Sequence, residues 1–182
     1  VSIAVVDMDF SLNHPEMAGI YDRELSKDFS GFDFKKISEW GADVEHGGMT
    51  SALIGANGDD DVGVTGVAKQ SRIIALNITT NGRPVNLFEV FKYAVDSGAK
   101  VINCSIGVEN PGREQLKELR DGVQYAADHD VVIVASAGFF ECIGIPPILC
   151  GDKAAFVEAL SLPRLAIVEA ALSACLASEG SL

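Results

Sequence analysis

Three polar groups stand where the sequence predicts the ends of strands or the start of a helix. Asp7 directly follows the apolar run VSIAVV, and Ser105 follows the run VINC. His46 begins the small and apolar stretch HGGMTSALIGAN. A carboxylate, an imidazole and a hydroxyl are the groups that acid–base and nucleophilic catalysis use. A carboxylate at the tip of a buried strand is an unusual choice for stability alone.

Short runs rich in Val, Ile and Ala predict four strands that are buried on both faces, as in a parallel sheet. These runs cover residues 1–7, 71–78, 99–107 and 130–138. Helical patterns lie between them at 46–57, 85–98 and 112–130. Two of these patterns have an apolar face, formed by Leu87, Val90, Phe91, Ala94 and Val95 in one and by Leu116, Leu119, Val123 and Ala126 in the other.

Alternating strands and helices predict right-handed crossovers and an α/β fold, with a doubly wound, mainly parallel sheet and helices on both faces. Asn86 is expected to cap the helix at 85–98, and Gly98 to end it. Functional groups of such sheets collect at the carboxyl ends of the strands. We therefore expect Asp7, the residues 105–107 and the residues 137–139 at one edge, within reach of His46.

The length of 182 residues predicts a single domain, residues 1–182. Residues 20–45 are polar and irregular and predict surface loops with at most one short strand, whereas residues 139–158 are interrupted by Gly and Pro and favour no element. Residues 163–177 are strongly apolar, with a Pro near the start, and predict a buried helix.

The charge and the hydropathy pattern of the sequence argue against two classes of function, nucleic-acid binding and a membrane-spanning protein. A net charge of −12 argues against nucleic-acid binding, which needs clustered Lys and Arg. No apolar run is long enough for a membrane span, and no signal peptide is visible, although the abrupt start within a strand pattern suggests a trimmed N-terminus. Localisation and oligomeric state stay open.

The four cysteines form no C-x-x-C pair, so a zinc cage is not indicated. Cys104 and Cys175 lie in apolar runs and are expected in the core. Cys142 and Cys150 flank a short loop, where either a disulfide or two reduced thiols is possible.

Four motifs in order resemble the subtilisin-like serine proteases, over about residues 1–138. They are VVDMDFSLNHPEM, HGGMTSALI followed by GVTGVAK, VINCSIGV and VVIVASAGF. The resemblance implies that Asp7 orients His46, and that His46 acts as general base and then general acid for a serine nucleophile. It also implies that Ser105, Ile106 and Gly107 bind a peptide or protein substrate as an added strand. No cofactor is required, but Asp60 matches the side chain of a structural calcium site.

The resemblance weakens after residue 138. Phe139 stands where the family has its oxyanion-hole Asn, and a phenyl ring cannot donate a hydrogen bond to an oxyanion. The family's Gly-Thr-Ser-Met-Ala motif has no clean match; Ser161, before Pro163 and an apolar stretch, is the nearest, and Ser181 is a weaker one. Met49 replaces the second His of the His-Gly-Thr-His motif. Residues 139–182 are therefore divergent or abbreviated.

Several alternatives are open. Asp7 is also compatible with the cap of a simple turn, and Asp9 with competition for the imidazole. Ser161 is equally compatible with a helix N-cap, and the acidic run at 59–61 with a solvated loop. His14 and His129 are expected to be structural or solvated. Two functions follow: a subtilisin-like serine endopeptidase, or a catalytically inactive pseudoenzyme that binds peptides or acts as a scaffold.

Overall fold

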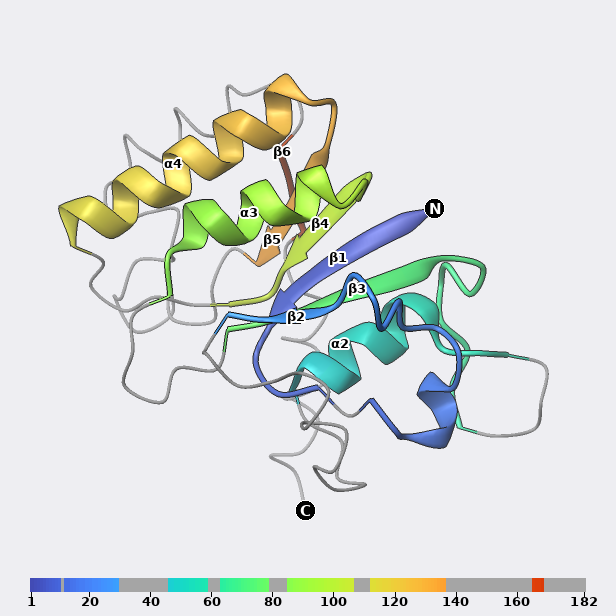
Figure 1. The fold of residues 1–182 in the computed structure, drawn as a ribbon. Helices are drawn as coiled ribbons and strands as arrows, with labels where there is room; N and C mark the ends of the chain where they lie inside the picture. The colour runs from blue at the N-terminus through green and yellow to red at the C-terminus, as the bar shows by residue number, and fades with distance from the viewer. Residues whose placement is uncertain are drawn as a thin grey trace, which may run out of the picture.

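The computed structural model has ten helices and strands among the residues that it describes (Figure 1). It describes residues 1–10, 12–29, 46–58, 63–78, 85–106, 112–136 and, for the backbone, 165–168. The strands are β1 (Ser2–Asp7), β2 (Lys27–Asp28), β3 (Arg72–Asn77), β4 (Val101–Cys104), β5 (Val132–Ser136) and β6 (Leu165–Val168). The helices are the 3₁₀-helix η1 (Pro15–Met17), α2 (His46–Gly55), α3 (Leu87–Asp96) and α4 (Arg113–Asp128).

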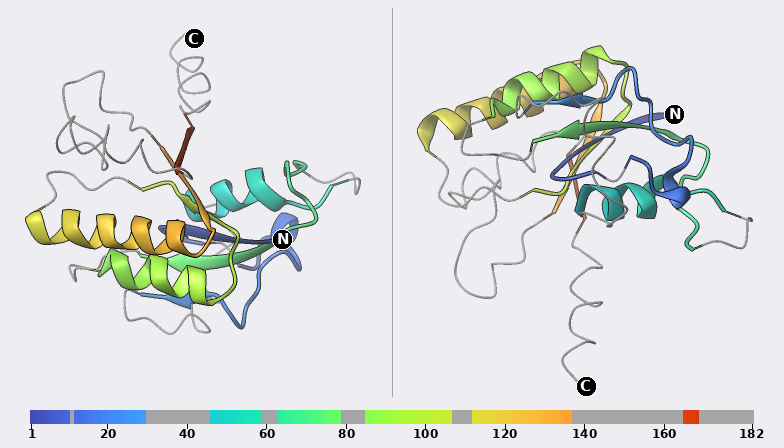
Figure 2. Two further views of the ribbon diagram at one scale, coloured as in Figure 1. Left: turned by 90° about the horizontal axis from the view of Figure 1, so that it is seen from above. Right: turned by 60° about the horizontal axis from the view of Figure 1, so that its bottom comes forward.

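The strands form one sheet in the order β2-β3-β1-β4-β5-β6, and every pairing is parallel. The chain passes from β1 to β3 on one side and then crosses back over β1 to β4. Helix α2 covers one face, and α3 and α4 cover the other (Figure 1 and Figure 2). The connections β2–α2–β3 and β3–α3–β4 move across the sheet in the same direction with their helices on opposite faces, so these two crossovers have opposite hands, and the predicted right-handedness does not hold for both. The change of direction at β1 creates a switch point at its carboxyl end. The predicted α/β, doubly wound, parallel fold is confirmed.

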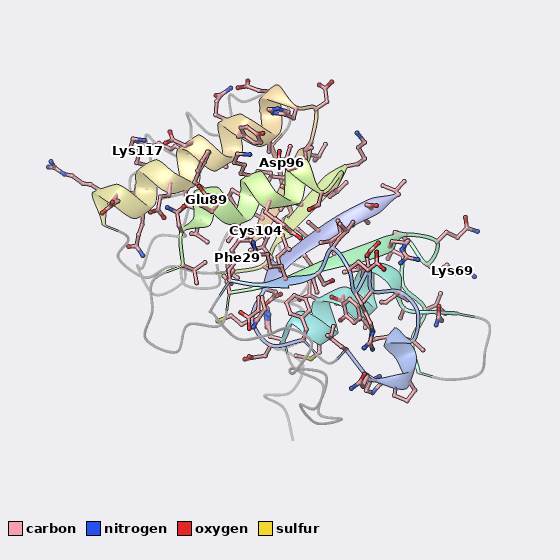
Figure 3. All side chains as sticks on the ribbon, viewed as in Figure 1. Phe29, Lys69, Glu89, Asp96, Cys104 and Lys117 are labelled. Carbon is pink, nitrogen blue, oxygen red and sulfur yellow. The ribbon has the colours of Figure 1, made fainter. Side chains whose placement is uncertain are left out.

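Strands β1 and β3 bury side chains on both faces, as their continuous apolar runs predicted, whereas β4 and β5 fully bury only alternate residues and differ from that prediction. Alternate residues belong to two separate apolar clusters. The cluster on the α2 face includes Val5, Ile73, Ala75, Phe10, Met17 and Tyr21. The cluster under α3 and α4 includes Ala4, Val6, Ile74, Leu76, Ile102 and Cys104. The charged side chains Glu89, Asp96 and Lys117 extend from the outer surfaces of α3 and α4 (Figure 3).

Helix α2 packs closely against the sheet because its inward face consists of small residues. Gly47, Gly48, Ser51 and Gly55 are its buried positions. Helix α3 begins at the predicted cap, where the Asn86 side chain accepts a hydrogen bond from the Glu89 amide. Gly98, just past its end, has a φ of +82°, which glycine adopts without strain. The predicted inward face of α3 is buried in full, whereas Leu116 of α4 is only half-buried.

The predicted helix over 163–177 is wrong at the four residues that the structure describes. Leu165–Val168 instead form β6, which pairs with β5 from Ile133↔Leu165 to Ser136↔Val168. A four-residue apolar run with Ile and Val suits a strand beside an open sheet edge as well as a buried helix, and periodicity does not separate the two. The rest of 163–177 lies outside the described residues, as does most of 139–182.

The described part of the stretch 20–45, residues 20–29, contains the short strand β2, as predicted, but it is less exposed than predicted. Ile20, Tyr21, Ser26 and Asp28 are buried. Tyr21 forms a parallel bridge to Ile73, so this part of the chain extends the sheet edge instead of lying over the surface.

Candidate active site

Asp7 ends β1 at the centre of the sheet, paired in register with Asn77 of β3. Its side chain is fully buried. The Met8 amide donates a hydrogen bond of 2.7 Å to Asp7 Oδ1, so the chain turns directly around the carboxylate. Asn77 Oδ1 accepts a bond of 3.1 Å from the Asp9 amide, and Asp9 has a φ of +57°. These contacts fix the turn that follows β1.

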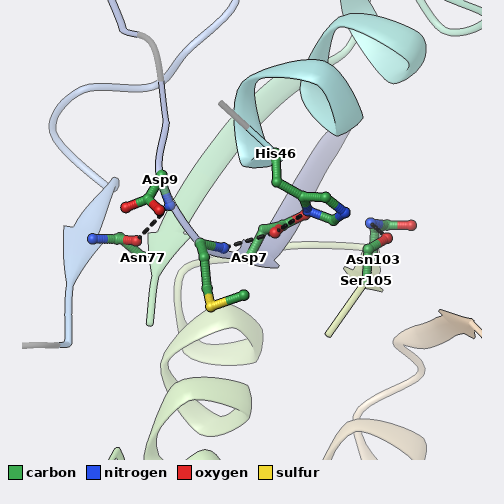
Figure 4. Close-up of polar contacts among 7 residues, drawn as sticks. Asp7, Asp9, His46, Asn77, Asn103 and Ser105 are labelled. Carbon is green, nitrogen blue, oxygen red and sulfur yellow. Dashed lines mark hydrogen bonds and ion pairs between the residues drawn. The ribbon is translucent and has the colours of Figure 1, made fainter. Parts of the chain in front are cut away.

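His46 is the first residue of α2, and its Nδ1 lies 2.6 Å from Asp7 Oδ1 (Figure 4). An ionised carboxylate only accepts hydrogen bonds, so Nδ1 carries the proton and Nε2 of the neutral ring has a free lone pair. The Gly47 amide donates 2.8 Å to the Met8 carbonyl, which fastens the start of α2 to the turn after β1. The side chain of His46 is 52% exposed, so the ring is partly open to solvent.

Burial and hydrogen bonding act in opposite directions on the pKa of Asp7. Burial raises the pKa of the Asp7 carboxyl above its usual 3.8, and hydrogen bonds from His46 and the Met8 amide offset part of that rise. Asp7 therefore depends on these donors to stay ionised in a site that water does not reach. A carboxylate of this kind is suited to hold and stabilise an imidazolium, which is the role that the resemblance implied for it.

The end of β4 lies beside His46, on the side opposite Asp7. Asn103 Nδ2 donates 2.9 Å to Ser105 Oγ, and Ile106 is buried. Figure 4 shows Asn103 and Ser105 across the His46 ring from Asp7. The register Val6↔Cys104 explains this, because it brings Ser105 level with Asp7. Asn103 was not predicted, although its position two residues before Ser105 on an alternating strand was a usable signal.

Four predicted site residues lie outside the described residues: Gly107, Phe139, Ser161 and Asp60. Within the described part of the chain, His46 forms its side-chain hydrogen bond with Asp7 and none with a serine hydroxyl. No group of three or more His, Cys, Asp and Glu side chains there is arranged to hold a metal ion. None of the helices in the described ranges is long and apolar enough to cross a membrane.

One other histidine and one thiol take the places expected of them. His129 ends α4, with its Nδ1 2.7 Å from the Tyr125 carbonyl, far along the chain from the site. Cys104 is a free, buried thiol. Burial raises its pKa to about 12, so it stays protonated and unreactive.

A buried carboxylate holds a half-exposed imidazole at the switch point of a parallel α/β sheet, an arrangement that is typical of hydrolases with a hydroxyl nucleophile. The model of the subtilase family, Peptidase_S8, matches residues 1–144. The chain belongs to the subtilase family.

Individual relatives agree with this assignment. The chain is 31% identical over 140 residues to the thermophilic serine proteinase of Bacillus sp. strain AK1, covering 75% of this chain and 32% of that protein. It is 32% identical over 142 residues to thermitase of Thermoactinomyces vulgaris, covering 75% and 46% respectively. The chain thus spans less than half the length of these relatives.

Solved structures show the same fold. Fervidolysin from Fervidobacterium pennivorans, a keratinolytic enzyme related to subtilisin, superposes with a TM-score of 0.61 at 26% identity, covering 76% of this chain and 21% of that one. The epidermin leader peptide processing serine protease of Staphylococcus aureus superposes with a TM-score of 0.63 at 19% identity, covering 92% of this chain and 46% of that one. The second likeness concerns the fold alone.

Proposed function

We propose that the chain provides the acid–base half of a subtilisin-like serine endopeptidase, with Asp7 as the orienting carboxylate and His46 as the general base. The observation that carries this proposal is the 2.6 Å contact between His46 Nδ1 and the fully buried Asp7 Oδ1. Burying a carboxylate costs folding free energy unless a hydrogen-bonded or oppositely charged partner compensates. The exposed Nε2 is the atom that receives a proton.

In the proposed reaction, His46 Nε2 takes the proton of a serine hydroxyl as its oxygen attacks the carbonyl carbon of a peptide bond. The imidazolium that forms is stabilised by Asp7. His46 then gives the proton to the leaving amine, and the acyl group stays on the serine. Water repeats the sequence and releases the acid. Ser161 is the candidate nucleophile from the sequence.

The proposed substrate is an extended peptide or protein segment that aligns with residues 105–107 as an additional strand. The end of β4 lies beside His46, which supports this placement, and half-buried Ser105 leaves room for contact. Backbone pairing of this kind gives affinity with little dependence on sequence, so the side-chain preference would come from other parts of the site.

A catalytically inactive, peptide-binding subtilase is the second candidate function. It is favoured by Phe139, which replaces the oxyanion donor, and by the absence of a clean nucleophile motif. Loss of such a donor costs about 10²–10³ in turnover. This candidate retains the strand-like peptide contact at residues 105–107 and lacks the acyl transfer.

Labelling of the full chain with a fluorophosphonate probe, followed by peptide mass mapping, separates the two candidates. The protease proposal expects a covalent adduct at Ser161 that His46→Ala abolishes and Ser181→Ala leaves intact. An adduct at another serine would keep the reaction and reassign the nucleophile. No adduct on folded protein, together with peptide binding by calorimetry, would favour the inactive candidate.

Calcium binding at Asp60 is a separate part of the proposal, supported by the match to the family motif and by the preference of calcium for oxygen ligands. We expect millimolar CaCl₂ to raise the melting temperature of the chain and Asp60→Asn to remove that rise. An equal rise in both proteins would assign the effect to calcium bound elsewhere and overturn the assignment of Asp60.

A further inference from the structure

Five of the six large apolar side chains that are exposed among the described residues lie on α2 or on segments bonded to it. They are Met8, Met49, Leu53, Val64 and Val67. The Gly47 amide donates 2.8 Å to the Met8 carbonyl, and the Val67 amide donates 3.1 Å to the Leu53 carbonyl. Met49 and Leu53 are four residues apart in α2, so they lie on one side of the helix. The outer side of α2 is therefore an apolar patch that begins next to His46.

Helix α2 has the composition of a helix that is buried on all sides. Its ten residues, HGGMTSALIG, include no Asp, Glu, Lys or Arg. In contrast, α3 and α4 present charged side chains such as Glu89 and Lys117 to solvent (Figure 3). A helix without a charged face is expected inside a core. The glycine-rich side of α2 already faces the sheet, so the apolar patch on its outer side requires a cover.

The sheet face beside α2 is also covered only in part by the described residues. Helix α2 packs on β1 and β3. The register places Val101, Val132 and Val134 on the face that carries Val5 and α2. These three valines are half-buried, whereas Ile102, which faces α3 and α4, is completely buried. An apolar element over β4 and β5, alongside α2, would bury both the valines and the patch.

The sequence that follows β6 has the composition and the starting point of such an element. Strand β6 ends at Val168, opposite Ser136, at the carboxyl edge of the sheet where α2 also begins. Residues 169–182 read EAALSACLASEGSL, with no charge between the two glutamates. At helical spacing, one side of this segment carries Leu172, Cys175 and Leu176. As a helix it would span about 21 Å, against about 15 Å for α2. Only two strand spacings, about 10 Å, separate β6 from β4.

We propose that residues 169–182 form a helix that packs alongside α2, with its apolar side against Met49 and Leu53. Two packed helices lie about 8–10 Å apart, which places the second helix over β4 and β5, where it buries their valines. The proposal gives a partner to Met49, which stands where the family motif has its second His. It concerns how the chain completes its core beside His46, and it does not depend on the proposed catalysis.

Disulfide formation tests the contact directly, because the segment contains a native thiol, Cys175. Mild oxidation of the full chain should join the introduced thiol to Cys175 within one molecule in Met49→Cys, in Leu53→Cys or in both, as detected by peptide mass mapping without reduction. Glu89→Cys, on the outer surface of α3, is the control and should form no bond to Cys175. Failure of both test variants to form the bond, or a bond to another native cysteine, would overturn the proposal. A bond between two molecules would assign the patch to a second copy of the chain and would also overturn it.

Lysine substitutions measure the burial of the patch independently. Leu53 is 58% exposed and Val1 is 77% exposed, so lysine should be tolerated at both positions if nothing covers them. We expect Leu53→Lys to lower the denaturant midpoint and Val1→Lys to leave it unchanged. Leu176→Lys should lower the midpoint as well, with little further loss in the double variant, because both changes disrupt one contact. A midpoint of Leu53→Lys equal to that of the wild type would refute the proposal. Neither experiment uses turnover, so a chain that fails to label with the fluorophosphonate probe is tested equally well.

Discussion

The substitution Gly47→Ala tests whether close packing of α2 against the turn after β1 holds the catalytic pair together. A Cβ atom at Gly47 would lie 2.9 Å from the Met8 carbonyl oxygen, 3.0 Å from the Asp9 carbonyl oxygen and 3.0 Å from Phe10 Cε1. Two of these atoms belong to the backbone of a turn that is itself hydrogen-bonded, so they cannot rotate away. The start of α2 must move outward by a few tenths of an ångström to restore ordinary contacts.

The size of the effect follows from two opposing terms. Overpacking a fitted contact typically costs about 1–3 kcal/mol. Replacing Gly by Ala in a helix interior returns up to about 1 kcal/mol, and less in the first turn. We therefore expect Gly47→Ala to lower the free energy of unfolding by about 1–2 kcal/mol. Because His46 precedes Gly47, the same movement should lengthen the 2.6 Å bond between His46 Nδ1 and Asp7 Oδ1.

Denaturant unfolding and the His46 Nδ1 proton resonance measure the two consequences separately. Gly112→Ala is the matched control, because Gly112 also lies at the start of a helix and its Cβ would meet nothing nearer than Gln115 Oε1 at 3.8 Å. Because Ala is a poorer N-cap than Gly, we expect the control to cost up to about 1 kcal/mol and to leave the His46 resonance unchanged. A Gly47→Ala variant as stable as the wild type, with an unchanged resonance, would refute the packing argument.

Three further predictions concern the buried groups. In the wild type, the raised folded-state pKa of Asp7 favours the folded state below the usual carboxyl pKa of 3.8, and this contribution is lost as pH rises. The free energy of unfolding of Asp7→Asn should therefore increase relative to that of the wild type between about pH 4 and pH 7. A difference between the two proteins that is the same at both pH values would contradict this. Cys104, buried with a pKa of about 12, should react with a thiol reagent only at the rate of unfolding, and fast labelling of native protein would disprove its burial. Gly122→Ala should destabilise the chain by about 1–3 kcal/mol in thermal or denaturant melts, since its Cβ would lie 2.5 Å from Phe91 Cδ2; a stabilised variant would show that helix propensity dominates there.

The central strands and their helices were predictable because local pattern and tertiary burial agree there. Val5 and Val6 face opposite sides of the sheet, and both are buried, which is what a continuous apolar run requires. Asp7 and His46 were predictable as a pair only through the order of the motifs. Nothing in the spacing of 39 residues implies a contact until α2 is known to run back along β1.

Other parts of the structure depend on contacts that no local pattern encodes. Tyr21 lies in a polar, irregular stretch, and its burial comes from the bridge to Ile73. Ser51 is one of several small residues in α2, and only the packing of that helix distinguishes it. The strand at Leu165–Val168 was mistaken for helix because an open sheet edge beside β5 decides its conformation, and that edge is not visible in the local sequence.

The position of β1 in the sheet has a consequence for how the site is assembled. During synthesis β1 leaves the ribosome before either of its neighbours, β3 and β4, whose pairing residues begin at Arg72 and Val101. Its apolar side chains therefore stay unpaired until strands that are distant in sequence have been synthesised. Such long-range pairing gives the fold a high contact order and slow folding. A nascent chain of this kind exposes an unpaired, aggregation-prone strand. The Asp7–His46 pair can form only late, after the centre of the sheet is complete.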